Sequence, residues 1–275
     1  DAPSVPLLSV DLPGEIYTPI AALAPNGPDA NAVLGYPLLT YFKEGRLYKV
    51  ALTKPGTPVP IQLSSLTSVC TVAARYHVLA DASDNLVEAI EAGPDGNCAT
   101  SADNRRALVH TTDTSATPPV YLPAGVSLLA PLRDMRGNLI WSLAREVTGA
   151  DTKLVLISPT GVPAGDVVGG TGPFGATFLL GSDDTSSQAA YMKVDTTLRR
   201  ITWDAAGATL SGSLFTVGST GVWMLSDFAG TYFAHGLDVY KLVGAGTPTL
   251  LAQLKSDYGA IANAAQTPSR LVFQQ

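Results

Sequence analysis

The feature that most constrains the fold is a segment that occurs near both ends of the chain. Residues 41–50 read YFKEGRLYKV, and residues 232–242 read YFAHGLDVYKL. Both segments continue into Gly-Thr-Pro, at 56–58 and 246–248, and then into Gln-Leu, at 62–63 and 253–254. Tyr41 and Tyr232 lie 191 residues apart, which is close to four units of about 48 residues. This spacing predicts a repeat architecture.

Weaker copies of the segment lie between these two. They are NLVEAI at 85–90, NLIWSL at 138–143 and AYMKVD at 190–195. A unit of about 40–50 residues that holds several short strands is typical of a β-propeller. Residues 270–273 (RLVF) resemble the opening strand of a sixth unit, and strands near 16–20 (IYTPI) would close the ring.

We therefore expect a single all-β domain over residues 1–275, a β-propeller of about six short antiparallel blades. The alternative is a β-sandwich in which the hairpin match is accidental. Strand-like runs at 47–52, 107–110, 154–157 and 222–225 fit either fold. The most helix-like segment, 257–265, is short and contains a glycine.

Composition excludes several classes of protein. Charged residues make up 15% of the chain and hydrophobic ones 46%, the reverse of a disordered sequence. The 26 glycines and 20 prolines suit many turns between strands. The net charge of −6 argues against nucleic-acid binding. We expect no membrane span, because no run of about 18 apolar residues occurs.

Cys70 and Cys98 are the only cysteines, and they flank a loop rich in Asp, Gly, Asn and Pro. A disulfide between them implies an oxidising compartment; two buried thiols are the alternative. The chain begins Asp1-Ala2-Pro3 without an initiator Met, as after removal of a leader or trimming. No glycosylation acceptor is present, so we expect a secreted or periplasmic bacterial protein.

Residues 92–104 (AGPDGNCATSADN) resemble a G-x-D-G-x-C-x-T-A-D-D loop of secreted bacterial propeller-like proteins of poorly defined function. The hairpin repeats are similar to those of bacterial extracytoplasmic β-propellers. The chain departs from the loop pattern by inserting Ser101 and placing Asn104 where the final Asp stands. It lacks the Trp-docking motif of quinoprotein propellers, so no quinone cofactor is expected.

The same loop is the best candidate metal site. Calcium prefers several oxygen ligands on a tightly turning backbone, and Asp95, Asn97 and Asp103 would supply them. Asp81 and Asp84, on the preceding turn, would add to this set. The alternative is a disulfide-pinned hairpin with Asp and Asn in turn positions. Calcium is the one cofactor that the sequence suggests, and none is required.

The three histidines are His77, His110 and His235. His77 and His110 lie on either side of the disulfide loop, and if they converged they would suit copper or zinc. The alternative is that they are ordinary strand residues with hydrogen bonds or solvent contact. His235, beside Gly236, is expected at an exposed hairpin tip.

The remaining motifs do not indicate a catalytic or cofactor-binding site. Residues 170–175 (GTGPFG) match a dinucleotide fingerprint, but a strand rather than a helix is expected to follow at 176–181. Asp183 and Asp184 are expected to be solvated turn acids that point apart, unlike a glycosidase pair. Trp141, Trp203 and Trp223 are expected to pack between blades.

With no catalytic constellation visible, the favoured hypothesis is a binding or interaction module. Its partner would be a protein, a cell-surface polymer or a subunit of an extracellular assembly. One alternative is an extracellular enzyme that acts on a glycan through acids at the propeller channel. The other is a metal-binding surface protein, since fold alone does not decide function.

Overall fold

The computed structural model describes residues 38–51, 61–80, 83–100, 102–175, 177–183, 186–218, 222–227, 230–253, 259–263 and 270–274. These residues form strands, turns and irregular segments without a helix, so the all-β prediction is confirmed. In this part of the chain, no helix has the length and apolarity needed to cross a membrane.

The chain divides into two compact units, each described here by itself. The first comprises Asp1–Ala124 with Pro159–Gly161, and the second comprises Gly125–Ser158 with Val162–Gln275. The single domain expected over residues 1–275 stays a prediction.

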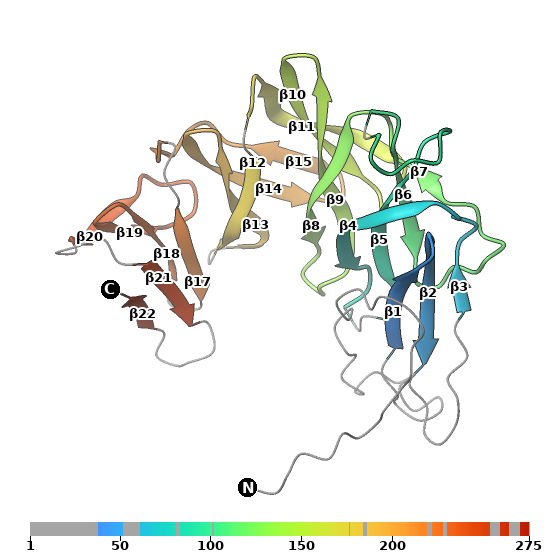
Figure 1. Cartoon of the computed structure of the whole chain (residues 1–275). Coiled ribbons are helices and arrows are strands. Elements are labelled where there is room, and N and C mark those ends of the chain that lie inside the picture. Colours follow the sequence, from blue (N-terminus) through green and yellow to red (C-terminus); the bar gives the residue numbers. More distant parts are fainter. Residues whose placement is uncertain are drawn as a thin grey trace, which may run out of the picture. The chain divides into compact units, whose positions relative to one another are not determined.

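The first unit holds two antiparallel sheets of consecutive strands (Figure 1). A three-stranded sheet contains β1 (Leu38–Lys43), β2 (Arg46–Ala51) and β3 (Ile61–Leu63). A four-stranded sheet contains β4 (Val69–His77), β5 (Asn85–Glu91), β6 (Arg105–His110) and β7 (Val120–Tyr121). The turn between β1 and β2 is Glu44-Gly45, and both residues have positive φ, 48° and 74°. This is the conformation that a tight two-residue hairpin turn requires.

One hydrophobic core joins these two sheets. Alternate residues of each strand point to one face, and those of β5 and β6 meet residues of the smaller sheet. The buried members are Leu47, Leu63, Leu66, Val69, Val87, Ala89, Ala107 and Val109.

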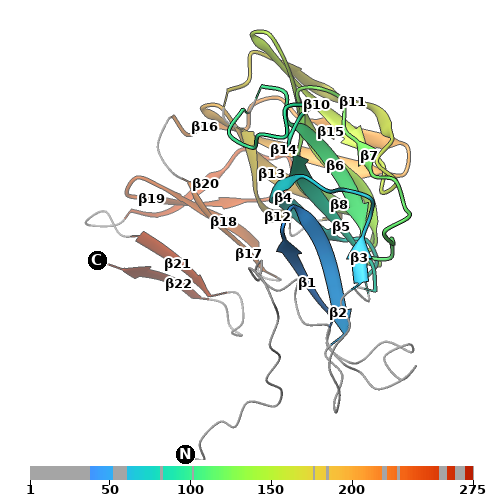
Figure 2. The same ribbon diagram turned by 45° about the vertical axis from the view of Figure 1, so that its right-hand side comes forward.

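The second unit begins with two four-stranded antiparallel sheets of consecutive strands (Figure 2). The first contains β8 (Val126–Arg133), β9 (Leu139–Thr148), β10 (Asp151–Ile157) and β11 (Pro163–Gly172). The second contains β12 (Thr177–Asp183), β13 (Ser186–Val194), β14 (Thr197–Asp204) and β15 (Gly207–Leu210). A single parallel residue pair, Val168 with Thr209, joins them into one curled sheet. The short β16 (Phe215–Thr216) also pairs with β14.

Two further sheets complete this unit. A four-stranded one contains β17 (Trp223–Asp227), β18 (Gly230–His235), β19 (Asp238–Leu242) and β20 (Thr249–Gln253). A two-stranded one contains β21 (Gly259–Asn263) and β22 (Arg270–Gln274).

The β12–β15 sheet is packed on both faces. Met192 of β13 belongs to a core shared with β8–β11, whereas its neighbour Tyr191 belongs to a core shared with β18 and β19. This alternation follows from the two-residue period of a strand. Sheets that follow one another in sequence therefore share cores within this unit.

The predicted strands are confirmed at β2, β6, β10 and β17. The five similar segments fall on β1–β2, β5, β9, β13 and β18–β19. Residues 270–273 form a strand as expected, but β21 precedes it, where the helix-like segment lies. There, pairing with β22 prevails over a weak helical pattern. Residues 16–20 lie outside the described residues. The described residues show no closed ring of blades, so the six-blade propeller remains a prediction.

Candidate functional site

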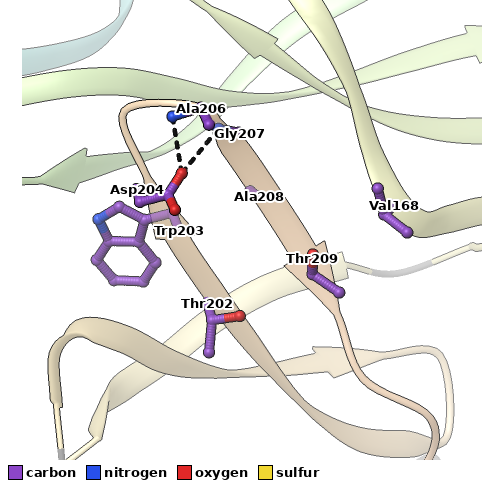
Figure 3. Close-up of a pocket in the computed structure, with 8 residues that line it drawn as sticks. All are labelled: Val168, Thr202, Trp203, Asp204, Ala206, Gly207, Ala208 and Thr209. Carbon is purple, nitrogen blue, oxygen red and sulfur yellow. Dashed lines mark hydrogen bonds between the residues drawn. The ribbon is translucent and has the colours of Figure 1, made fainter.

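A pocket of about 330 Å³ lies over β14, β15 and β11, the central strands of the curled sheet (Figure 3). Thr202 on β14 is paired with Thr209 on β15, and Thr209 is paired with Val168 on β11. Paired residues of neighbouring strands share a face, so these three side chains form one row across three strands. Asp204 and Gly207, two positions along each strand, lie on the same face.

A large bulge in β11 brings Val168 to this row. Lys153 pairs with Thr171 and Val155 pairs with Asp166, so residues 167–170 loop out of the ladder. Gly169 has a φ of +75°, and a Cβ built on it would meet the carbonyl oxygen of Leu210 at 2.7 Å. Only glycine combines this conformation with such a close approach to β15.

Asp204 organises the turn at the end of the pocket. Its Oδ1 accepts hydrogen bonds from the backbone N–H groups of Ala206, at 2.7 Å, and Gly207, at 3.1 Å (Figure 3). Within the described part of the chain, its Oδ2 makes no hydrogen bond. One carboxylate oxygen is thus used in the fold, and the other can accept a hydrogen bond from a ligand.

The indoles of Trp203 and Trp141 connect the β14–β15 hairpin to the β8–β11 sheet on the face opposite to the pocket row. The Trp203 N–H donates to the carbonyl oxygen of Arg133 at 2.7 Å, and the Trp141 N–H donates to that of Asp204 at 2.8 Å. Both rings are partly buried against the core between β8–β11 and β12–β15. These two tryptophans thus pack between consecutive sheets. Packing between propeller blades, the role expected for them, stays a prediction, and the side chain of Trp223 lies outside the described residues.

The structure does not bring His77 and His110 together. His77 pairs with Asn85 and His110 pairs with Leu86, which are adjacent residues of β5. Adjacent strand residues point to opposite faces, so the two imidazoles lie on opposite faces of the β4–β7 sheet. Among the described residues, no three His, Cys, Asp or Glu side chains gather as metal ligands.

His110 instead belongs to a polar cluster of the first unit. Its Nδ1 lies 2.6 Å from Asp84 Oδ2, and its Nε2 lies 2.7 Å from the carbonyl oxygen of Pro159. The hydrogen bond with Asp84 raises the pKa of His110 against the effect of burial, and the charge of Asp84 adds to the rise. Burial alone would raise the pKa of Asp84, but the hydrogen bond and charge of His110 lower it overall.

Lys49 joins the cluster from β2. Its Nζ donates to the carbonyl oxygens of Thr111, at 2.5 Å, and Asp113, at 3.4 Å. Burial lowers the pKa of Lys49, against the charges of Asp113 and Asp84. These hydrogen bonds join four segments of the chain, at Lys49, Asp84, residues 110–113 and Pro159. We call this structural cluster the clasp.

The disulfide between Cys70 and Cys98 is present, as expected. It pins an exposed loop in which Asp95 Oδ1 accepts from the N–H of Asn97 at 2.8 Å, and Asn97 Oδ1 accepts from that of Ala99 at 3.0 Å. These are local turn bonds. Asp103 is packed against Gly93, and Asp84 is engaged by His110 instead of adding to this loop. Asp81 lies outside the described residues.

The solvated-turn prediction for Asp183 is wrong. Asp183 ends β12, its side chain is fully buried, and its Oδ2 accepts from Arg200 Nε at 2.5 Å. The strand extends further than the polar composition of 181–187 suggests, because β13 pairs with it. Asp184 lies outside the described residues. The strand expected after 170–175 is confirmed as β12.

The sequence gives no local signal for the pocket residues. Thr202 and Asp204 look like any polar end of a strand, and Thr209 becomes their neighbour only through pairing. His235, expected at an exposed hairpin tip, ends β18 and is half-buried, with its ring edge-on to Phe215.

Comparison with known proteins adds little. No family model and no curated protein matches the chain. Among solved structures, the chain is similar to a structural genomics protein of unknown function from Bacteroides thetaiotaomicron, with 15% identity and a TM-score of 0.35. The match covers 77% of this chain and 57% of that one, so this chain spans little more than half of its length. So weak a likeness carries no functional inference.

Proposed function

We propose that the protein is an exported bacterial binding module with a β-propeller fold, and that the pocket beside Thr202 and Thr209 holds its ligand. The observation that carries the proposal is the composition of this pocket. It offers two hydroxyls and one carboxylate oxygen that make no hydrogen bond within the described residues, beside the apolar Val168. A few polar groups in a concave site are typical of ligand recognition.

The sheets support the propeller part of the proposal. Four sets of four consecutive strands are each paired antiparallel in sequence order: β4–β7, β8–β11, β12–β15 and β17–β20. The similar sequence segments begin on the second strand of each of these sheets, at β5, β9, β13 and β18. Four-stranded antiparallel blades with cores between neighbours are typical of propellers.

The pocket favours binding over catalysis. General acid–base chemistry uses groups within reach of each other and of the substrate. Asp204 is the one titratable group in the described lining, and half of its carboxylate is occupied by its own turn. A glycan-cleaving enzyme would need a second acid at this place.

An NMR titration with a library of small polar molecules tests the proposal. We expect amide shifts to cluster at residues 202–209, and we expect a pocket-filling Thr209→Trp variant to abolish them. Thr249→Trp, at an exposed position of β20, is the matched control and should bind normally. Absence of any shift at 202–209 would refute the binding function, and turnover of a compound would favour the enzyme.

Export is supported by the Cys70–Cys98 disulfide, because such bonds persist in oxidising compartments. We expect protein isolated from its source to gain the mass of two hydrogen atoms on reduction of the disulfide. Free thiols before reduction would contradict an oxidising compartment.

Calcium in the disulfide loop is a second proposal. Asp103 Oδ1 and Asn104 Oδ1 are buried without a hydrogen bond in the described structure, and such oxygens suit a hard cation. We expect calcium to raise the melting temperature relative to a chelator, since a ligand of the native state stabilises it. An unchanged melting temperature in excess calcium would exclude a structural ion.

A further inference from the structure

We infer that the pocket takes a neutral saccharide, bound by Asp204, Thr202 and Thr209. This inference rests on the proposed binding function and adds the chemical class of the ligand. It follows from three properties of the lining: its polar groups, its apolar side and its charge.

The polar groups suit a ligand that is rich in hydroxyls. Thr202 and Thr209 side chains make no hydrogen bond within the described part of the chain, and each hydroxyl can both donate and accept. Asp204 Oδ2 can only accept while ionised. A saccharide offers neighbouring hydroxyls that donate to the carboxylate and exchange hydrogen bonds with the threonines.

The apolar side suits the C–H face of a sugar ring. Val168 is 66% exposed although it is an aliphatic residue, and it stands in the same row as the two threonines. Covering its methyl groups removes apolar surface from water. A volume of about 330 Å³ is at the small end for ligand pockets, which run from about 300 to 1,000 Å³, and it suits a short saccharide.

The charge of the lining disfavours ionic ligands. Asp204 is the one charged residue of the described lining, and the chain has a net charge of −6, so anions are repelled. A cation would meet a single exposed carboxylate, which water and salt screen. Trp203 is also a lining residue, but its side chain alternates with those of Thr202 and Asp204 and packs against the core. We therefore expect no cation–π contact from its ring.

Neutral, anionic and cationic probes distinguish the possible ligand classes. The neutral probes are maltose, cellobiose and N-acetylglucosamine, the anion is glucuronate and the cation is putrescine. Binding is measured by NMR shifts of residues 202–209. We expect at least one neutral sugar to bind there, and glucuronate to bind at least about tenfold more weakly than that sugar.

Variants assign the binding to the named groups. Thr209→Val should weaken the sugar about three- to tenfold, because it removes one hydrogen bond. Asp204→Asn should weaken it about tenfold or more, because it removes a charge-assisted one. The controls are Thr249→Val and Asp134→Asn; Asp134 accepts from the N–H groups of Arg136 and Asn138 in a similar turn, whose residues do not line the pocket. Both should bind sugar normally.

The outcomes distinguish failure of the saccharide assignment from failure of the proposed binding function. If putrescine or glucuronate binds at 202–209 and no neutral sugar does, the saccharide class is wrong and the binding function stands. If sugar binding survives both pocket variants, the site assignment is wrong. If nothing binds at 202–209, both this inference and the proposed function fall.

Discussion

At the scale of single residues, His110 shows how two neighbouring acceptors favour one protonation state. Asp84 Oδ2 and the carbonyl oxygen of Pro159 carry no hydrogen, yet each lies within 2.7 Å of a ring nitrogen. With Asp84 ionised, both contacts are satisfied when each nitrogen carries a hydrogen, so this geometry favours the protonated ring, in line with the raised pKa of His110. A ring that donates from both nitrogens has no lone pair left for a metal ion.

This pair makes stability depend on pH in a defined window. The pKa of His110 is raised on folding, so its contribution is complete below the unfolded value of about 6.5 and is lost as pH rises through the folded value. The pKa of Asp84 is lowered, so its contribution is present above about 3.9 and is lost as pH falls through the folded value. The clasp is therefore strongest between these limits.

We predict that His110→Gln lowers the free energy of unfolding by about 1.5–3 kcal/mol near pH 5.5, the size of a hydrogen bond to a charged group. The cost should shrink as pH rises past the raised pKa of His110. Urea denaturation from about pH 5.5 to 9 measures it. His235→Gln, the same substitution at a histidine outside the Asp84–His110 pair, is the control. A cost of His110→Gln that stays constant across this range would show that the bonded ring is neutral.

Burial decides what an ion pair contributes. Asp183 is fully buried beside Arg200, whereas the side chains of Lys153 and Asp166 are 40% and 55% exposed. We predict that Arg200→Met costs about 3–5 kcal/mol, because it leaves a buried carboxylate without its guanidinium. Lys153→Met should cause no resolvable change. Chemical denaturation of both variants measures this, and equal effects would contradict the argument.

The role of a residue can be predicted from the sequence when it depends on local neighbours. It cannot be predicted when strand pairing determines which distant residues the side chain contacts. Cys70 and Cys98 were predictable because their number and spacing allow one bridge. Asp183 was not, since its burial depends on Arg200, which lies 17 residues away on another strand. The separation of His77 from His110 depends on strand register, which a single sequence does not reveal.

At the scale of elements, Gly93 shows how closely the disulfide loop packs on its sheet. A Cβ there would lie 2.6 Å from the carbonyl oxygen of Asp103 and would also collide with its carboxylate. We predict that Gly93→Ala lowers stability by about 1–3 kcal/mol through overpacking. Gly212→Ala, with nothing within 4 Å, should be neutral or stabilising by up to about 1 kcal/mol. Thermal melts that rank the two variants the other way would contradict this packing.

The disulfide closes a loop with a sequence separation of 28. We predict that the double variant Cys70→Ala, Cys98→Ala loses about 3–4 kcal/mol, because the unlinked unfolded chain gains conformational entropy. Urea denaturation of oxidised, reduced and double-variant protein measures this. Reduced wild type should match the double variant, and unchanged stability on reduction would show that the loop is already ordered in the unfolded state.

Strands were the most predictable elements, because apolar runs between Gly, Pro, Asn and Asp mark them well. Residues 154–157 are such a run, and they lie in β10. The bulge at 167–170 was hidden, since Gly169 and Gly170 also suit an ordinary loop. The pocket depends on that bulge, so it could not be read from the pattern of the sequence.

At the scale of the whole molecule, the repeat predicts a closed ring. A compact chain of 275 residues has a radius of gyration of about 19 Å. We predict this value from small-angle X-ray scattering, together with the scattering profile of a disc. A clearly larger radius would exclude a closed six-blade ring. The number of blades was beyond the sequence, because the intervening copies of the repeat are too weak to be counted reliably.

The paired indoles of Trp141 and Trp203 have a spectroscopic consequence. Each donates its N–H to a carbonyl oxygen of the opposite sheet, and each is partly covered by the core between the sheets. Any separation of β8–β11 from β12–β15 would break both bonds and admit water, which shifts indole emission to longer wavelength. Intrinsic tryptophan fluorescence would therefore report on contact between these two sheets of the second unit, without an added dye.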